Sequence, residues 1–186
     1  MKSTDLRPGM AVRMDGKLYV IAQFTHVTPG NLRAFVQVKL RDVMTGSYLE
    51  KRLRSGEDVE RIELDRREME YLYSDASGHV FMDQQSYDQV HLSDEMLGDA
   101  MKFLKPNTAV QALVHDGKVI SIELPQTVDL RVTDTPPVAT GATVTNQLKE
   151  AELETGLKVR VPQFILNGEL VRVKTEDGSY LGRAKD

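Results

Sequence analysis

Hydrophobic and polar residues alternate in short stretches along most of the chain. From residue 34 to residue 40 every second side chain is hydrophobic, while Gln37 and Lys39 lie on the opposite face. A period of two over this length predicts a strand with one buried face. Other strand-like runs lie at 110–114, 119–124 and 170–173. The pattern favours an all-β chain built from short strands.

Asp-Gly pairs separate several of these runs. They occur at 15–16, 116–117 and 177–178. An Asp-Gly pair between two apolar runs is a strong hairpin signal, because a type I′ turn requires positive φ at both central residues. Hairpins that recur in this way favour several small β-modules over one large sheet.

One helix is predicted, from a cap at Ser93 to a stop at Pro106. Hydrophobic residues recur between them at helical spacing, and Ser is a common N-cap residue. Asp94 and Glu95 suit the positive end of the helix, whereas Lys102 suits its other end. We expect this helix to stand alone in a β-rich chain.

Breaks in the pattern divide the chain into three modules, 1–63, 64–126 and 127–186. The first boundary follows the polar stretch 54–60, and Pro125 precedes a new strand-like run at 127–132. The stretch 133–145 contains Pro and Gly and predicts a long loop in the last module. Modules of about 60 residues are near the lower limit for a domain with its own core.

The composition is that of a soluble globular chain, with 40% hydrophobic and 28% charged residues among 186. No apolar run is long enough to span a bilayer, and residues 1–5 lack the apolar core of a secretory signal. Without Cys, the chain has no disulfide, no thiol nucleophile and no thiolate metal site. We expect a cytoplasmic protein without a membrane partner.

The formal charge of −4 by itself disfavours a nucleic-acid binder, whose surface is usually basic. The charge is unevenly distributed, however. Residues 1–63 hold 11 Lys or Arg and 8 Asp or Glu, a net of +3. Residues 64–125 hold 5 and 11, a net of −6, and residues 126–186 hold 8 and 9, a net of −1. This segregation indicates the partner better than the total does.

Five basic residues of the first module fall on two strand-like segments. They are Lys39, Arg41, Lys51, Arg52 and Arg54. Residues two apart share a face of a strand, so a hairpin of the two segments would unite these side chains in one patch. Such a patch can follow a phosphate backbone. The alternative is an ordinary solvated strand face.

Motifs typical of enzymes and metal sites are missing from the sequence. The histidines His26, His79, His91 and His115 lack metal-ligand spacing. There is also no nucleophile elbow, dinucleotide-binding or phosphate-loop pattern. We therefore expect no enzymatic activity, no metal and no cofactor.

The most specific pattern lies in the last module. Residues 149–162, KEAELETGLKVRVP, followed by Ile165 and Gly168, resemble the signature of bacterial elongation factor P. That signature runs K-x-A, four residues, G, two residues, an aliphatic residue, x-V-P, and ends in an aliphatic residue and Gly. Residues 178–183, GSYLGR, resemble the family's terminal G-x-Y-x-x-R. Further similarities lie at 7–10, 35, 38–41, 45–46, 71–73, 75 and 81–82, so the resemblance covers essentially the whole chain.

The resemblance implies a three-domain, L-shaped, all-β protein, with an SH3-like barrel at 1–63 and OB-type barrels at 64–126 and 127–186. By resemblance, it is a monomeric translation factor that binds the ribosome between the peptidyl-tRNA and exit sites. It would relieve stalling at consecutive prolines, with ribosomal RNA of both subunits and peptidyl-tRNA as partners. The chemistry would belong to the ribosome. The alternatives are a general RNA-binding protein, or a paralogue that acts on a subset of stalling sequences.

The resemblance also implies that a loop of the first domain steadies the CCA end of peptidyl-tRNA. Its residues are Pro29, Gly30, Asn31, Leu32 and Arg33. Pro-Gly is a turn former, so the residues after it project. The family carries a modified Lys or Arg where this chain has Asn31, which supports neither modification. Arg33 can supply the cation, and we expect the loop to act unmodified; the alternative is an ordinary surface turn.

A second RNA contact is expected in the last module. Its residues are Leu153, Thr155, Gly156, Tyr180 and Arg183. On the faces and loops of an OB-type barrel, a tyrosine can stack on a base and an arginine can bind a phosphate. By resemblance, this end faces the small ribosomal subunit. The alternative is that Tyr180 packs in the core and Arg183 pairs with Glu176 or Asp177.

Overall fold

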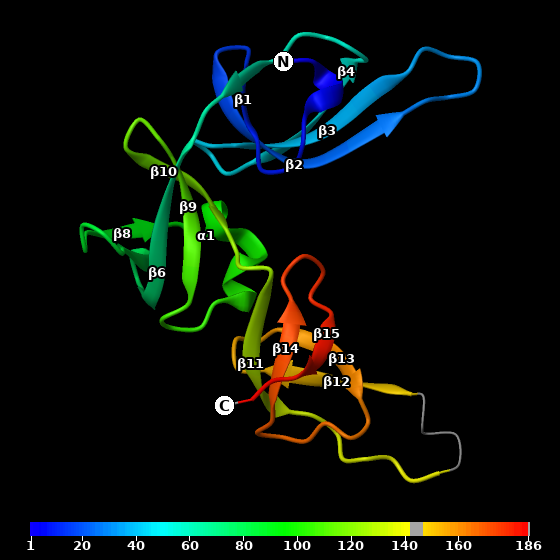
Figure 1. The fold of residues 1–186 in the computed structure, drawn as a ribbon, viewed down its shortest axis with the longest axis vertical. Helices are drawn as coiled ribbons and strands as arrows, with labels where there is room; N and C mark the ends of the chain where they lie inside the picture. Colours follow the sequence, from blue (N-terminus) through cyan, green and yellow to red (C-terminus); the bar gives the residue numbers. More distant parts are fainter. Residues whose placement is uncertain (142–146, 186) are drawn as a thin grey trace. The chain divides into compact units, whose positions relative to one another are not determined.

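Strands dominate the computed structural model of the chain, which describes residues 1–141 and 147–185 (Figure 1). They form three curled five-stranded sheets, and this confirms the predicted all-β fold class. The helical segments of the described residues are short. They are η1 (Ser3–Asp5), α1 (Asp94–Leu97) and η2 (Gly98–Phe103).

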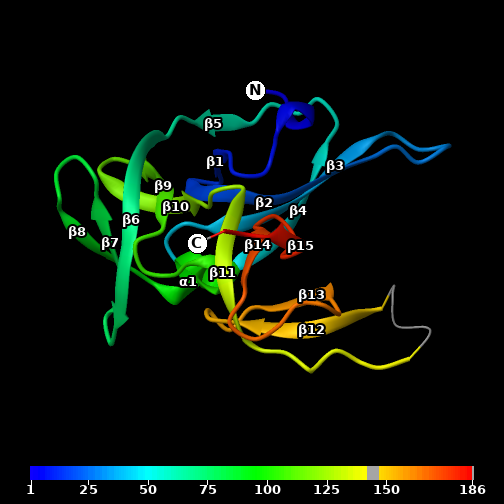
Figure 2. The same cartoon turned by 60° about the horizontal axis from the view of Figure 1, so that its bottom comes forward.

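The first sheet has the strand order β4-β3-β2-β1-β5. Its strands are β1 (Ala11–Met14), β2 (Lys17–Val27), β3 (Phe35–Asp42), β4 (Tyr48–Arg54) and β5 (Glu60–Ile62). The predicted alternation is confirmed in β3, where Val36, Val38 and Leu40 are fully buried. They pack with Leu6 and Val12 in the core of this sheet. The short edge strand β5 lies beside β1 (Figure 2).

Two of the predicted Asp-Gly turns are type I′. Asp15 and Gly16 have φ of 50° and 75°, and Asp116 and Gly117 have 48° and 74°, as that turn requires. The third pair also belongs to a hairpin, but only Gly178 has positive φ, at 73°. The hairpin closes through a longer loop, in which the amide of Lys174 donates to the carbonyl of Ser179 at 2.9 Å.

The second sheet has the strand order β10-β9-β6-β7-β8. Its strands are β6 (Asp65–Asp75), β7 (Gly78–Asp83), β8 (Gln89–Leu92), β9 (Ala109–His115) and β10 (Lys118–Glu123). Tyr71 and Phe81 face each other across β6 and β7, with ring centroids 5.3 Å apart. Met69 and Val80 are buried on the same strands. A cross-strand aromatic pair such as Tyr71–Phe81 stabilises antiparallel strands.

The helix predicted between Ser93 and Pro106 is confirmed at its start but is wrong as a single continuous helix. The hydroxyl of Ser93 does accept a hydrogen bond from the amide of Met96, at 3.3 Å, as an N-cap does. The α-helix ends at Leu97, however, and continues as the 3₁₀ segment η2. Gly98 has φ of 51°, which an α-helix does not allow, and this residue divides the two segments.

The third sheet has the strand order β13-β12-β11-β14-β15. Its strands are β11 (Thr127–Asp134), β12 (Leu148–Leu153), β13 (Lys158–Pro162), β14 (Leu170–Lys174) and β15 (Tyr180–Arg183). The long strand β11 pairs with β14 through its first five residues and with β12 through its end. Of the loop predicted at 133–145, residues 135–141 lie outside strands, and 142–145 fall outside the described residues.

Each sheet contains a hairpin loop of the same form. The loops are Asp42–Ser47, Asp83–Asp88 and Lys174–Ser179. In each loop the amide of the fifth residue donates to the carbonyl of the first at 2.9 Å. That fifth residue is Gly46, Tyr87 or Gly178, and its φ lies between 62° and 73°. The backbone requires a left-handed residue here, which favours glycine.

By packing, the chain divides into two compact units whose limits cut through β6 and β9. One comprises 1–67, 93–96 and 112–123, and the other 68–92, 97–111 and 124–186. The first unit contains the tip loop and the basic strands predicted as RNA contacts. The second contains the predicted contact of the last module.

Candidate nucleic-acid interface

The predicted tip loop connects the two strands of a long hairpin. Strands β2 and β3 pair as far as Val27 and Phe35, and the loop occupies residues 28–34 (Figures 1 and 2). The amide of Leu32 donates to the carbonyl of Pro29 at 3.3 Å, so the loop folds back on itself as a turn. This agrees with the turn predicted from Pro-Gly.

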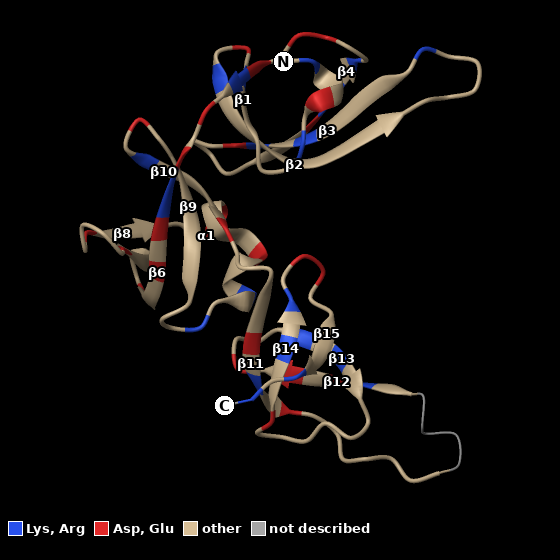
Figure 3. Cartoon of the chain, in the orientation of Figure 1, with Lys and Arg blue, Asp and Glu red and all other residues tan. Residues whose placement is uncertain are grey.

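Arg33 is the one Lys, Arg, Asp or Glu between Leu18 and Val38. It therefore supplies the hairpin's only charge near the tip (Figure 3). Asn31, Leu32 and Arg33 are all exposed, Leu32 to 73%. Among the described residues, the Arg33 guanidinium has no hydrogen-bond or ion-pair partner. The tip thus presents a cation that is free to contact a ligand.

A hollow of about 260 Å³ lies at the base of the tip. Its lining residues are Arg33, Ala34, Phe35, Arg52, Leu53 and Arg54. The Arg52 guanidinium carbon lies 3.6 Å from the centroid of the Phe35 ring, a close cation–π contact. Phe35 pairs with Arg54 across β3 and β4, so the aromatic ring and both arginines lie on one face. Arginine binds phosphates with several donors, and an aromatic ring can stack on a base.

Lys39 extends this face along β3. Its ammonium lies 5.0 Å from the centroid of the Tyr48 ring. The cross-strand neighbour of Lys39 is Glu50, which accepts a hydrogen bond from Gln37 at 3.2 Å. The structure therefore brings Lys39, Arg52 and Arg54 to one face, together with Arg33 at its tip end. We call these four residues and Phe35 the hairpin face.

Arg41 does not belong to the hairpin face, contrary to the prediction of a single patch. It is 5% exposed, and its Nη2 donates to the carbonyl of Ile120 in β10 at 2.6 Å. Burial lowers the pKa of the guanidinium, and its Nη1 has no hydrogen-bond partner. A buried cation held by one carbonyl cannot contact a phosphate at the surface.

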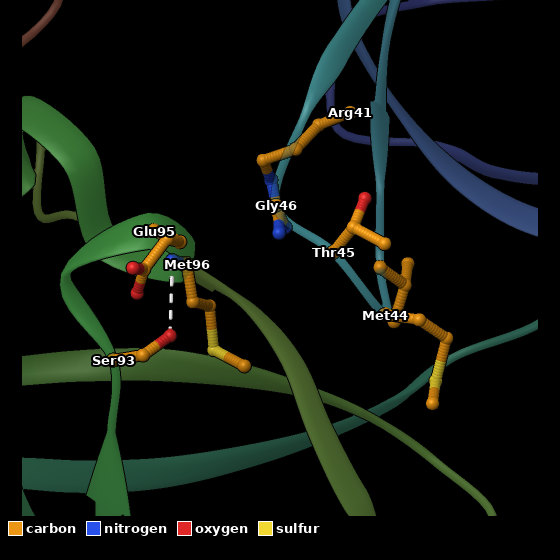
Figure 4. Close-up of a pocket in the computed structure, with 8 residues that line it drawn as sticks. Arg41, Met44, Thr45, Gly46, Ser93, Glu95 and Met96 are labelled. Atoms are coloured by element: carbon orange, nitrogen blue, oxygen red, sulfur yellow. Dashed lines mark hydrogen bonds between the residues drawn. The ribbon is translucent and has the colours of Figure 1, made fainter.

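Arg41 instead lines a pocket of about 180 Å³ beside the Asp42–Ser47 loop between β3 and β4. The pocket is closed by Met44, Thr45 and Gly46 on one side and by Ser93, Glu95 and Met96 on the other (Figure 4). Glu95 turns its carboxylate away from Arg41 (Figure 4). Both sides of this pocket belong to the first compact unit.

Lys51 is also separated from the hairpin face. It pairs with Val38, whose side chain is buried, and therefore lies on the opposite face of β4 from Arg52. Its ammonium contacts the Asp15 carboxylate at 2.9 Å. That hydrogen bond lowers the pKa of Asp15. Lys51 thus joins two hairpins of the first sheet.

The residues predicted as an RNA contact in the last module do not form one surface. Leu153 is 1% exposed and belongs to the core of the third sheet. The hydroxyl of Thr155 donates to the carbonyl of Lys102 at the end of η2. Gly156, with φ of 83°, forms the exposed turn between β12 and β13. Of these three residues, only Gly156 is exposed, and it offers backbone alone.

Tyr180 and Arg183 lie at opposite ends of β15. Tyr180 packs against the core of the third sheet, and burial raises the pKa of its hydroxyl. The alternative prediction for Tyr180, that its ring packs against the core, is confirmed. The alternative pairing of Arg183 with Glu176 or Asp177 is wrong, because its Nε lies 3.0 Å from the carboxylate of Glu169. Glu176 pairs with another cation, the ammonium of Lys174, at 2.7 Å.

Phe164 was not among the predicted contact residues, yet it is 51% exposed beside Arg183. The Arg183 guanidinium carbon lies 4.6 Å from the centroid of the Phe164 ring. No alternation marks its exposure, because Phe164, Ile165 and Leu166 are consecutive apolar residues outside the strands. The third sheet thus carries a cation–π pair of the same type as the hairpin face.

The described residues contain no group of three His, Asp or Glu side chains placed to hold a metal ion. No helix among them is long and apolar enough to cross a membrane.

Comparison with known families accounts for nearly the whole chain. The elongation factor P KOW-like domain matches residues 2–59, the elongation factor P OB domain matches 64–122, and the C-terminal domain of elongation factor P matches 128–183. Together, these matches cover far more than half of the chain.

Curated relatives agree with the family matches. The elongation factor P of Acidobacterium capsulatum is 44% identical over 182 residues, which are 98% of each chain. That of Moorella thermoacetica is 42% identical over 184 residues, 99% of this chain and 100% of its own. That of Symbiobacterium thermophilum is 44% identical over 180 residues, 97% of both. The chain therefore belongs to the elongation factor P family and is a translation elongation factor.

Proposed function

We propose that the chain binds the ribosome between the peptidyl-tRNA and exit sites and stimulates peptide-bond formation where consecutive prolines stall it. The hairpin face contacts peptidyl-tRNA near its CCA end. Ribosomal RNA and tRNA in the cytoplasm are then the partners of a monomer, and the reacting groups belong to the ribosome. The chain contributes position and charge without a catalytic residue of its own.

The unpaired Arg33 at the hairpin tip is the observation that carries this proposal. Its side chain is long and cationic, and no neighbour among the described residues engages it. The flanking segments of the hairpin carry no other full charge from Leu18 to Val38. A cation on such a hairpin can reach a phosphate in a confined RNA cavity. Arg52 and Arg54 can hold the backbone on either side of that contact.

Translation of a Pro-Pro-Pro template tests the proposal. Addition of the chain should relieve stalling on this template and leave a control template unchanged. Arg33→Ala should reduce the rate of rescue by about tenfold, the effect of losing one charge-assisted hydrogen bond of about 1.5 kcal/mol. Arg13→Ala, which removes an exposed arginine of β1 paired with Glu60, should have no effect. Failure of the unaltered chain to relieve proline stalling would refute the proposal.

Binding and rescue separate the elongation factor from a general RNA-binding protein. A factor of the proposed kind co-sediments with ribosomes that carry peptidyl-tRNA and dissociates when Arg33 and Arg52 are replaced. A general RNA-binding protein would bind free RNA equally well and would not affect proline templates. A factor that relieves other stalling sequences but not prolines would be the specialised paralogue.

We propose further that the tip acts unmodified, since Asn31 accepts neither of the family's modifications. The mass of the intact protein from its native host should equal the mass calculated from the sequence. An added mass that maps to residues 28–34 would overturn this part of the proposal.

A further inference from the structure

Phe164 is held in an exposed position by a hydrogen-bonded turn between β13 and β14. Its neighbour Ile165 is fully buried and anchors the turn in the core of the third sheet. The amide of Ile165 donates to the carbonyl of Pro162 at 3.2 Å, and the amide of Leu166 donates to the Glu169 carboxylate at 2.7 Å. The exposure of the Phe164 ring is therefore fixed by the fold of the turn.

Arg183 is fixed beside this ring by two further contacts. Its Nη2 donates to the carbonyl of Phe164 at 3.3 Å, and its Nε lies 3.0 Å from the Glu169 carboxylate. Together with the 4.6 Å cation–π contact, these hold the guanidinium next to the ring. The Arg183 side chain nevertheless remains 52% exposed.

This pair suits an unpaired base better than a phosphate. Aromatic rings and guanidinium planes both stack on bases, and each base contributes on the order of 1–3 kcal/mol when stacked on such a side chain. Glu169 already neutralises Arg183, so attraction of a phosphate at this point is weak. A half-exposed phenyl ring, by contrast, gains from being covered by a flat aromatic partner.

We propose that Phe164 and Arg183 form a stacking site for an unpaired base of RNA. The proposal rests on the proposed function in one respect, that the partner is RNA of the translation machinery. It assigns the aromatic contact of this domain to Phe164 in place of Tyr180, whose ring packs against the core. The ligand is a single-stranded segment, because a paired base has no free face to offer.

The chain contains no tryptophan, which allows a direct test. Phe164→Trp places the only tryptophan of the variant at the proposed site, and its emission is followed with excitation that the tyrosines do not absorb. Leu166→Trp introduces the same fluorophore in the same turn, at a residue with matching exposure of 52%. Short single-stranded RNA should quench Phe164→Trp to saturation, leave Leu166→Trp nearly unchanged, and lose its effect when it is annealed to its complement.

Equal quenching of both tryptophans, or equal quenching by duplex RNA, would overturn the proposal. The matching affinity test uses the full chain and labelled single-stranded RNA. Phe164→Tyr should bind as the unaltered chain does, whereas Phe164→Leu and Arg183→Lys should bind about fivefold or more weakly. If Phe164→Leu retains full affinity, the surface is an apolar contact for a protein, and base stacking is refuted.

The readouts also keep this proposal separate from the proposed function. Fluorescence quenching requires no ribosome and no proline template. If proline rescue fails while Phe164→Trp is quenched selectively, the proposed function falls and the stacking site stands. If rescue succeeds and depends on Arg33 while both tryptophans respond alike, the stacking site falls alone.

Discussion

Gly46 cannot be replaced without strain, for two separable reasons. Its φ of 71° is a left-handed conformation that costs a residue with a Cβ about 1–2 kcal/mol. A Cβ at this position would also lie 2.5 Å from the Cβ of Glu95. Gly56 has a similar φ, 80°, but a Cβ there would meet no atom within 4 Å. Substitution of Gly56 by Ala therefore measures backbone strain alone, whereas substitution of Gly46 by Ala adds the effect of overpacking.

We predict that Gly46→Ala lowers the free energy of unfolding by about 1–3 kcal/mol more than Gly56→Ala does. Urea denaturation of both variants measures the difference. Gly30→Ala, at an exposed position without positive φ, is the control and should change stability little. Equal losses at Gly46 and Gly56 would mean that Glu95 moves aside without cost.

Asp129 and Arg172 form a bidentate ion pair between β11 and β14. The Nε and Nη2 of Arg172 donate to the two carboxylate oxygens at 2.8 and 2.9 Å. These hydrogen bonds lower the pKa of Asp129 below its ordinary value of 3.8 and raise that of Arg172. The pKa of Asp129 is thus lower in the folded state than in the unfolded state. The ion pair therefore stabilises the fold above about pH 4, and this stabilisation is lost as the pH falls through the folded-state pKa.

Asp129→Asn should therefore destabilise the chain by about 0.5–1 kcal/mol at pH 7, in the range of a well-oriented surface pair. The difference from the unaltered chain should shrink as the pH falls below 4, because the unfolded state of the latter is protonated first and the folded carboxylate follows at its lowered pKa. Thermal unfolding followed at pH 7 and at pH 3 measures both values. A difference that is the same at both pH values would contradict the ion-pair explanation.

At the scale of the strand pair β3–β4, Arg41 and Arg52 have opposite roles. Arg52 lies on the hairpin face over Phe35, whereas Arg41 is buried against Ile120. We predict that Arg52→Glu weakens ribosome binding and that Arg41→Met does not. Arg41→Met should also change stability by less than about 1 kcal/mol, since burial of the charge offsets the hydrogen bond that it makes.

Co-sedimentation at several protein concentrations compares the two variants, and urea denaturation confirms that each is folded. A loss of binding in a folded Arg41→Met variant would restore Arg41 to the RNA-binding surface. Unchanged binding of Arg52→Glu would reduce the hairpin face to an ordinary solvated strand face.

Local rules predicted the strands and turns of this chain well. Alternation identified the buried face of β3, and Asp-Gly located the hairpins at 15–16 and 116–117. Both signals depend on only a few neighbouring residues, so tertiary contacts did not change the predicted strand face or turns. The position of Lys51 was also available from alternation, because it is offset by one residue from Arg52 and must lie on the other face.

Long-range packing decided the features that the sequence did not reveal. Arg41 lies two residues after Lys39 and therefore has the same position in the alternating pattern. It is buried because β10 places the carbonyl of Ile120, 79 residues further along the chain, against its guanidinium. The helix predicted from Ser93 was divided by the left-handed backbone at Gly98, a conformation that apolar spacing does not report. The pairing of Arg183 depended on the path of the turn that carries Glu169.

At the scale of the whole molecule, the two surfaces that we propose as RNA contacts differ in their charge. The hairpin face carries unneutralised cations in the part of the sequence whose net charge is +3. The Phe164–Arg183 pair lies in residues 126–186, whose net charge is −1, and its cation is already paired. The first contact should therefore be electrostatic and the second should depend on stacking.

Salt dependence distinguishes these two contributions to ribosome binding. Removal of one phosphate contact should reduce the slope of log K against log salt concentration by about 0.7–0.9, because one fewer counterion is released on binding. We predict such a reduction for Arg33→Gln and again for Arg54→Gln. Phe164→Leu should instead lower affinity by a similar factor at every salt concentration and leave the slope unchanged, because it removes no charge.

Binding measured between about 50 and 200 mM salt, the range in which phosphate contacts dominate the change, gives all three slopes. Lys51→Gln serves as the control, since this cation is engaged by Asp15 on the opposite face of β4. A slope that falls equally for Lys51→Gln and Arg33→Gln would mean that the net charge of the molecule governs binding. A fall confined to Arg33 and Arg54 would instead require that the hairpin face itself lies against the phosphate backbone.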